Sequence, residues 1–143
     1  MDLQVEVAAP IELGELPAGR RRVIPITGGQ VQGQLGPGRV LAGGADWQWV
    51  LEGRVAQLEA HYVLEFDGGR RVAVHNRALR VASAETTAAL LRGEVVDPKQ
   101  VYFRCQPRFE TAVPEWRWLM ERQFVGTGER EPAAVLMSFF SVE

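Results

Sequence analysis

One hairpin decides the fold: residues 63–75 read V-L-E-F-D-G-G-R-R-V-A-V-H. Apolar and polar side chains alternate along both arms, as they do on the two faces of a β-strand. Asp67-Gly68-Gly69 lies between the arms, and glycine supplies the positive φ that a tight turn requires. The stretch therefore predicts two antiparallel strands, Val55–Phe66 and Arg71–His75, joined by a short turn.

Short alternating segments, separated by glycine and proline, fill the rest of the chain. Fifteen glycines and eight prolines interrupt the 143 residues, and turns are predicted at Thr27-Gly28-Gly29, Gly36-Pro37-Gly38 and Gly43-Gly44. The other predicted strands are Leu3–Val7, Val23–Ile26, Val31–Leu35, Arg39–Ala42, Asp46–Leu51, Val101–Cys105, Trp116–Val125 and Val135–Val142. Strands at this spacing predict a single all-β, mainly antiparallel domain over residues 1–143, its sheet rolled into a closed or nearly closed barrel.

One segment breaks this rhythm and predicts a short helix, Ala84–Arg92. Ser83 can cap its first turn through the side-chain hydroxyl, and Gly93 can end it in a left-handed conformation. The basic run Arg20-Arg21-Arg22 follows Pro17-Ala18-Gly19. We interpret this run as part of a solvated loop.

Composition excludes several classes of protein. The chain carries 18 acidic and 16 basic residues, a net charge of −2, so it lacks the positive field that holds a phosphate backbone, and we expect no nucleic-acid partner. No apolar run approaches the roughly 20 residues that cross a bilayer, so we expect no membrane association. The first residues lack a basic region followed by an apolar one, and one cysteine excludes an internal disulfide. A cytoplasmic location is expected.

Five runs of residues, taken in order, resemble one family. They are Ile24-Pro25-Ile26-Thr27-Gly28-Gly29, Gly43-Gly44-Ala45-Asp46-Trp47-Gln48, Tyr102-Phe103-Arg104, Pro107-Arg108-Phe109-Glu110-Thr111 and Trp118-Leu119. Together they resemble the uncharacterised bacterial and fungal DUF3237 proteins, also called UPF0311. The resemblance covers about residues 10–142 and implies a small β-barrel of calycin-like shape. It departs from the family pattern at His61, where the family tends to have arginine, and at Ala78, where it tends to have glycine.

The run Gly43-Gly44-Ala45-Asp46-Trp47 is the most distinctive candidate site. Asp46 can act as a general base or hold a ligand hydroxyl, and Trp47 can form a stacking wall. The alternative is structural, with the glycines forming a turn and Asp46 bonding nearby backbone amides. Period two places Asp46 and Gln48 on one strand face and the two tryptophans on the other, without saying which face points inward.

The hairpin contributes His61, Glu65, His75 and Asn76 as candidate site residues. His61 and Glu65 share one face, and Tyr62, Leu64 and Phe66 share the apolar face. The polar face points either to solvent or into a wet barrel lumen, and in the second case His61 lies near His75 or Asn76 across the sheet. Imidazole suits proton transfer near neutral pH. The two histidines with Asp46 or Glu65 could in principle form a His/carboxylate metal site. We expect none, because neither His-x-His nor His-x-x-x-His spacing occurs.

A second set of candidates lies in the C-terminal half of the chain. Arg104 follows the polar face of its strand and can hold a carboxylate or an oxyanion, or form an ion pair with Glu110. Trp118 can form an aromatic wall of a pocket or pack in the core. Cys105 lies on the apolar face, and we interpret it as a small buried hydrophobe.

Taken together, these features favour a barrel that binds a small, partly aromatic or carbonyl-bearing organic molecule. Asp46 or His61 would act as base and Arg104 as clamp, in lyase, isomerase or cyclase chemistry that needs no cofactor. The first alternative is a binding or carrier module without turnover. The second is an assembly role, because Phe139-Phe140 must point one ring out of the barrel, toward a second copy in a homo-oligomer.

Overall fold

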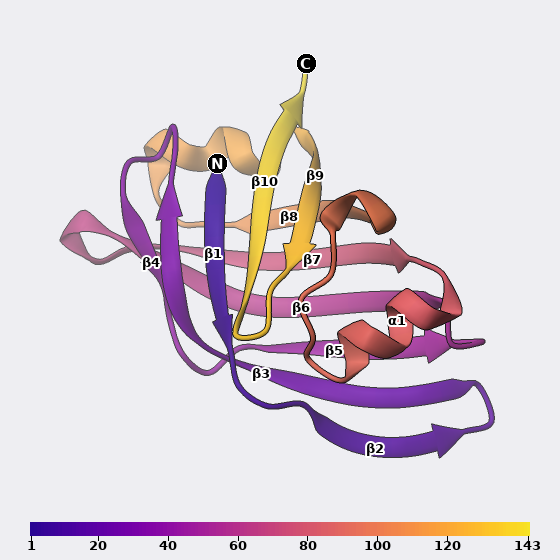
Figure 1. Ribbon diagram of the computed structural model, residues 1–143. Coiled ribbons are helices and arrows are strands. Elements are labelled where there is room, and N and C mark those ends of the chain that lie inside the picture. The colour runs from indigo at the N-terminus through magenta and orange to yellow at the C-terminus, as the bar shows by residue number, and fades with distance from the viewer.

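Strand pairing closes the sheet on itself in the computed structural model, which describes residues 1–143. The strands are β1 (Asp2–Val7), β2 (Ile11–Leu16), β3 (Gly19–Gln32), β4 (Gly38–Val40), β5 (Ala45–Leu51), β6 (Val55–Phe66), β7 (Arg70–Val81), β8 (Tyr102–Glu110), β9 (Gln123–Arg130) and β10 (Ala134–Val142). The ring runs from β1 through β10, β9, β8, β7 and β6 to β4, β5 and β3, and pairing of β1 with β3 completes it (Figure 1). The predicted antiparallel barrel is confirmed.

The seams of this ring differ greatly in length. β6 and β7 form the predicted hairpin and pair along their full length, around the turn η1 (Asp67–Gly69). β8 and β9 pair only at Arg104–Thr127 and Cys105–Gly126. β3 and β4 also pair at only two positions, but β5 joins β3 to β6 beside them. Among the seams that no other strand bridges, the β8–β9 seam therefore has the fewest paired residues to hold it.

Glycines at Gly28 and Gly29 lie inside β3, so the turn predicted there is wrong. The first part of β3 pairs with β2 and β5, and the second part pairs with β1 and β4. Gly29 has a φ of 137°, and a β carbon there would lie 2.0 Å from the backbone oxygen of Gln4. Glycine is needed because β1 approaches β3 closely where the barrel closes. The strand predicted at Val31–Leu35 is the end of β3 and stops at Gln32.

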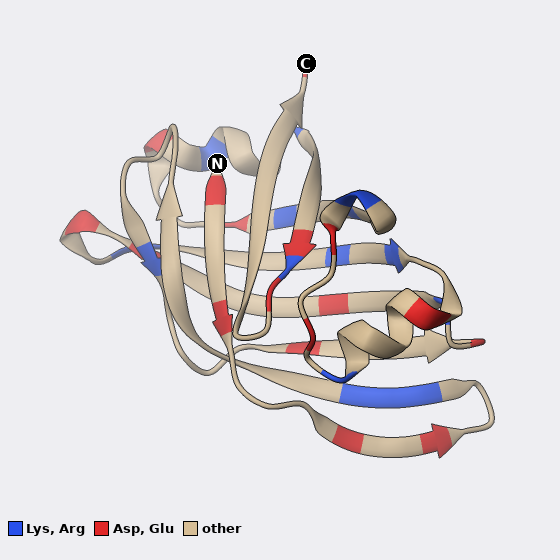
Figure 2. Ribbon diagram, in the orientation of Figure 1, with Lys and Arg blue, Asp and Glu red and all other residues tan.

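The basic run Arg20-Arg21-Arg22 belongs to β3 and pairs with β2 and β5, so the predicted loop is wrong. β2, which the sequence patterns did not predict, lies beside it with acidic residues opposite the basic run (Figure 2). Arg20 donates two hydrogen bonds to Glu12, at 2.9 and 3.2 Å. Arg22 is turned inward and buried.

Short helical segments close both ends of the barrel (Figure 1). The predicted helix is confirmed as α1 (Ala84–Leu91), where the Ser83 hydroxyl accepts a 3.1 Å bond from the Thr86 amide and Gly93 has a φ of 80°. α1 and the turn η2 (Pro98–Gln100) pack near Phe103 and Arg130. The structure contains no helix with the length and apolarity needed to cross a bilayer.

The strand predicted over Trp116–Val125 is wrong in its first half, where the chain forms the 3-10 helix η3 (Pro114–Met120). Proline at the first helical position favours this start. Trp116 contacts Phe66 edge to face, with ring centroids 4.9 Å apart. η3 therefore fills its end of the barrel with aromatic rings.

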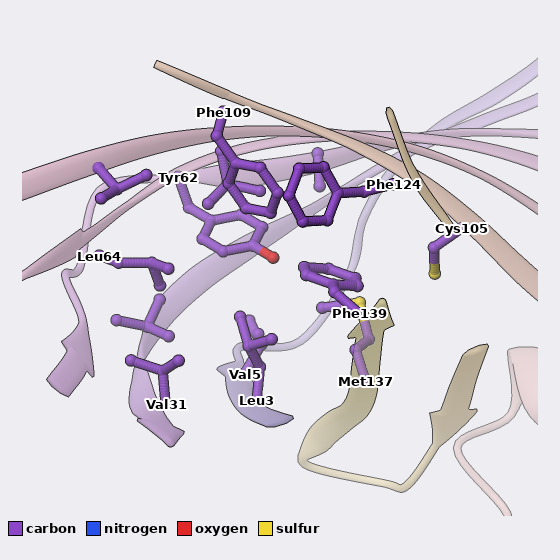
Figure 3. Close-up of a cluster of buried hydrophobic side chains, with 14 of the residues drawn as sticks. Leu3, Val5, Val31, Tyr62, Leu64, Cys105, Phe109, Phe124, Met137 and Phe139 are labelled. Carbon is purple, nitrogen blue, oxygen red and sulfur yellow. The ribbon is translucent and has the colours of Figure 1, made fainter. Parts of the chain in front are cut away.

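The interior is apolar near η3 and becomes polar toward α1. Alternate residues of β6 point inward, among them Ala60, Tyr62, Leu64 and Phe66, and all are buried. Figure 3 shows Tyr62 among the aromatic and aliphatic side chains of the core, its hydroxyl oxygen directed into the interior. Cys105 is buried, as its position on the apolar face predicts.

Candidate functional site

Asp46 and Gln48 place polar atoms on the inner face of β5. They alternate with Trp47 and Trp49, whose side chains lie outside. Nε2 of Gln48 donates a 2.8 Å hydrogen bond to Oδ2 of Asp46, while Oδ1 of Asp46 is buried and has no partner. The polar face of this strand is therefore the one that lines the interior.

Three arginines surround this pair from other strands. Arg22 lies opposite Gln48 on β3, Arg80 lies on β7 and Arg130 ends β9. Arg22 and Arg80 are only 3% and 4% exposed, which is unusual for charged residues. Nη1 of Arg22 lies 3.4 Å from Glu12 without a hydrogen bond, and Nη1 of Arg130 is buried without a partner. Asp46 therefore faces three guanidinium groups, of which Arg22 also lies beside Glu12.

Tyr62 and Asn76 complete the lining from the hairpin. The Tyr62 hydroxyl has no hydrogen-bond partner, and Asn76 donates only to Sδ of Met137, at 3.4 Å. We call the following residues the interior polar cluster: Arg22, Asp46, Gln48, Tyr62, Asn76, Arg80 and Arg130. Every buried side-chain nitrogen or oxygen without a hydrogen-bond partner in this structure belongs to this cluster. Such atoms are rare in proteins, so their convergence at one place makes this cluster the candidate functional site.

Burial controls the protonation of the cluster. Desolvation raises the pKa of Asp46 from 3.8 to about 6, against the opposing effects of the Gln48 hydrogen bond and the charges of Arg80 and Arg130. Desolvation lowers the pKa of Arg80 to about 10, and Asp46 opposes this shift. Burial also raises the pKa of Tyr62, so this phenol stays neutral and can donate a hydrogen bond. A carboxyl group that titrates near neutrality thus lies beside fixed donors.

The cavity inside the cluster is small, at about 30 Å³. Small inward side chains at Ala60 and Ala78 leave this space, and Ala60 pairs with Asp46 on one side and Asn76 on the other. The cavity has room for one or two water molecules. An organic ligand needs a larger cavity, so side chains of the lining must move to admit one.

His61 and Arg104 lie outside the barrel, away from Asp46, so the structure does not assemble these three residues into one site. Their strands turn the apolar residues inward, because that set buries the larger hydrophobic area. His61 stacks on His75, with ring centroids 4.0 Å apart. This confirms the proximity predicted across the hairpin, but on the outer face. Arg104 lies over the Tyr102 ring, 5.0 Å from its centroid.

Most of the other candidates of the sequence analysis lie on the outer surface, but Trp118 is partly buried against the core and Asn76 lies in the interior. Trp47 is 43% exposed and stacks with Arg21. Glu65 is paired with Arg39 and Arg71, Glu110 is exposed, and Trp118 packs against Phe124. Only Asn76 joins Asp46 in the interior.

Sequence reasoning missed the three arginines and the role of Tyr62. Two of the arginines carry a detectable signal, because each is in period-two register with apolar residues of its strand: Arg80 continues Val72 and Val74, and Arg22 precedes Ile24 and Ile26. A charged residue in the inward set of a strand points to a functional interior.

Comparisons with known proteins find similarity over nearly the whole chain. The sequence profile described as "Protein of unknown function (DUF3237)" matches residues 1–142. The UPF0311 protein RPA1785 of Rhodopseudomonas palustris is 44% identical over 129 residues, which are 90% of this chain and 84% of that relative.

Solved structures give the same picture. The crystal structure of RPA1785, described as a conserved protein of unknown function, superimposes with a TM-score of 0.95 at 40% identity and covers 99% of this chain and 93% of that one. A structure from Acinetobacter baumannii, described as a beta-barrel like protein, gives a TM-score of 0.85 at 38% identity, covering 99% and 92%. The relatives share the barrel over its full length.

Proposed function

We propose that this chain, which belongs to the DUF3237 family of proteins of unknown function, binds a small organic anion inside its barrel and exchanges a proton with it through Asp46. The observation that carries the proposal is the convergence of all unpartnered buried polar atoms on the interior polar cluster. Three guanidinium groups against the carboxyl groups of Asp46 and Glu12 leave one positive charge in excess. A carboxylate or enolate oxygen would give their N–H groups partners.

Asp46 has the properties of a general base. Its pKa of about 6 leaves it ionised at pH 7.5 yet basic enough to accept a proton. Oδ2 is held by Gln48, and Oδ1 remains free to face a substrate. A shifted pKa in an enclosed site is a known mark of functional carboxyl groups.

The reaction class that fits is proton abstraction next to a carbonyl group. The proton passes from a substrate carbon to Oδ1 of Asp46, and the electron pair moves to the substrate oxygen as an enolate. Arg80 and the neutral Tyr62 hydroxyl are placed to stabilise that oxygen. Return of the proton to another atom completes an isomerisation, and expulsion of a leaving group completes an elimination, both without a cofactor. Arg80 thereby takes the clamp role that the sequence suggested for Arg104.

Binding is tested by thermal shift with matched pairs of compounds: aromatic and β-keto carboxylates against their amides. A ligand that prefers the folded state raises the unfolding temperature. We expect the acids to raise it and the amides to have no effect, and Arg80→Gln to abolish the shift. Arg77→Gln, on the outer face of the same strand, is the control and should keep it. Equal effects of acids and amides would contradict the proposal.

Turnover is tested by NMR of the bound acids in D₂O, following exchange of the carbon-bound proton. We expect exchange to slow at least 100-fold in Asp46→Asn, since general-base catalysis contributes roughly 10²–10⁴-fold, while binding is retained. Binding without exchange in the wild-type protein would instead support the alternative of a carrier without turnover.

An assembly role is a second candidate, because Phe140 is 56% exposed on the outer face of β10 while Phe139 is buried. Light scattering distinguishes the two roles. A homo-oligomer that dissociates in Phe140→Ser would support assembly, and a monomer would exclude it.

A further inference from the structure

Two histidines and a glutamate converge on the outer face of the β6–β7 hairpin. His61 lies directly opposite His75 in the register, and Glu59 lies two residues before His61 on the same face. Nε2 of His75 and Oε1 of Glu59 are 2.8 Å apart. One nitrogen or oxygen atom from each of the three side chains lies within 4.8 Å of the others.

We propose that Glu59, His61 and His75 bind a divalent transition-metal ion, with Zn²⁺ the best fit. Two imidazoles and one carboxylate form a donor set typical of zinc, and hard ions such as Mg²⁺ and Ca²⁺ prefer oxygen alone. The side chains of Glu59 and His61 are exposed and that of His75 is half-buried, so water can supply the fourth ligand. The longest and best-paired seam of the barrel holds the three ligands on a rigid frame.

The required movement is small. Zinc binds nitrogen and oxygen at about 2.0–2.1 Å, which places two tetrahedral donors about 3.3 Å apart. The imidazole planes are 17° from parallel and must open toward the ion. Rotation of side chains achieves this without any change in strand pairing.

Neighbouring charges affect the affinity of this site for a cation. Arg77 lies opposite Glu59, and Arg108 lies opposite His75. Both arginines repel a cation. We therefore expect Arg77→Gln to tighten zinc binding.

This site is separate from the interior polar cluster. Side chains alternate along each strand, so His61 and His75 point out of the barrel while Ala60 and Asn76 point in. Asp46→Asn should leave zinc binding unchanged. The metal proposal thus stands or fails independently of the proposed function.

The test is calorimetric titration of ZnCl₂ into the full chain at pH 7.5, after EDTA treatment and without a polyhistidine tag. The chain has only two histidines, and its single cysteine is buried, so one zinc per chain is expected. His61→Gln and His75→Gln should each weaken binding at least tenfold. Glu65→Gln is the control, because Glu65 lies on the same face of β6 but is held by Arg39 and Arg71.

Imidazole NMR of the wild-type protein provides a test that needs no variant. Both histidines should show shifted ring nitrogens with one equivalent of zinc. Absence of binding, a response from only one histidine, or affinity unchanged in His61→Gln would each overturn the proposal.

Discussion

Gln48 holds one oxygen of Asp46 through a 2.8 Å hydrogen bond and leaves the other oxygen buried without a partner. The two residues lie two positions apart on one inner strand face, so the strand itself fixes their geometry. This asymmetry gives Asp46 one anchored and one free oxygen, the arrangement that a positioned general base needs. The same burial makes the residue a source of instability, which can be measured.

Asp46→Asn should remove a pH dependence of stability. The pKa of Asp46 is raised from 3.8 to about 6, so between these values the folded state binds a proton more tightly than the unfolded state. The free energy of unfolding of the wild type therefore falls as pH rises through this window, by about 3 kcal/mol in total. Above pH 6 the variant should be more stable than the wild type by up to this amount, and below pH 4 the difference should vanish.

Urea unfolding at pH 4 and pH 7.5 measures this difference. Asp67→Asn, in the exposed β6–β7 turn, is the control and should show no such change. A variant less stable than the wild type at pH 7.5 would contradict the expected sign.

Arg80→Gln should raise the pKa of Asp46 above its value of about 6. The positive charge of Arg80 lowers that pKa, and its removal leaves desolvation less opposed. Carbon-13 NMR of the Asp46 carboxyl across a pH titration measures the shift. Arg104→Gln, on the outer face, should leave the titration midpoint of the Asp46 carboxyl group unchanged. An unchanged midpoint in Arg80→Gln would mean that the two groups do not interact.

Gly44→Ala should destabilise the protein more than Gly43→Ala. A β carbon at Gly44 would lie 2.4 Å from the backbone oxygen of His61, so β5 and β6 must separate beside Asp46. Gly43 has a φ of 108° but open space around it, so alanine there meets backbone strain alone. We expect a loss of about 1–3 kcal/mol for Gly43→Ala and more for Gly44→Ala. Urea unfolding measures the loss in free energy of unfolding for each variant. A larger loss in Gly43→Ala than in Gly44→Ala would refute the steric explanation.

Ser83→Ala should weaken the helix that covers the polar end of the barrel. The Ser83 hydroxyl accepts a hydrogen bond from the Thr86 amide, and loss of such a cap costs about 1 kcal/mol. Thermal unfolding reports the loss, and hydrogen exchange of α1 should become faster. Ser141→Ala, on an exposed strand end, should change stability much less.

Local patterns predicted the barrel well because its strands, its main hairpin and α1 depend on neighbouring residues. The failures involve contacts between distant segments. Gly28-Gly29 resembles a turn in sequence, but β1 approaches at that point from the other end of the ring. Arg22 follows a predicted turn, so it was assigned to solvent, and only the pairing of β3 with β5 turns it inward.

The candidate site was half predictable for a related reason. Alternation divides each strand into two faces, but curvature of the closed sheet decides which face is inside. On β5 the inner face is polar and contains Asp46, whereas on β6 the inner face is apolar and leaves His61 outside. Asp46 and Asn76 were therefore both predicted as candidates, in separate groups, and their arginine partners were not.

The short β8–β9 seam is a weak point in the wall of this barrel. Only Arg104–Thr127 and Cys105–Gly126 join these strands, while the opposite end is plugged by aromatic rings. Among the seams that no other strand bridges, thermal breathing should part β8 from β9 first, so their amides should exchange before those of the longer seams. A ligand would then enter the interior at a rate set by this opening. The observed association rate would therefore level off as the ligand concentration increases.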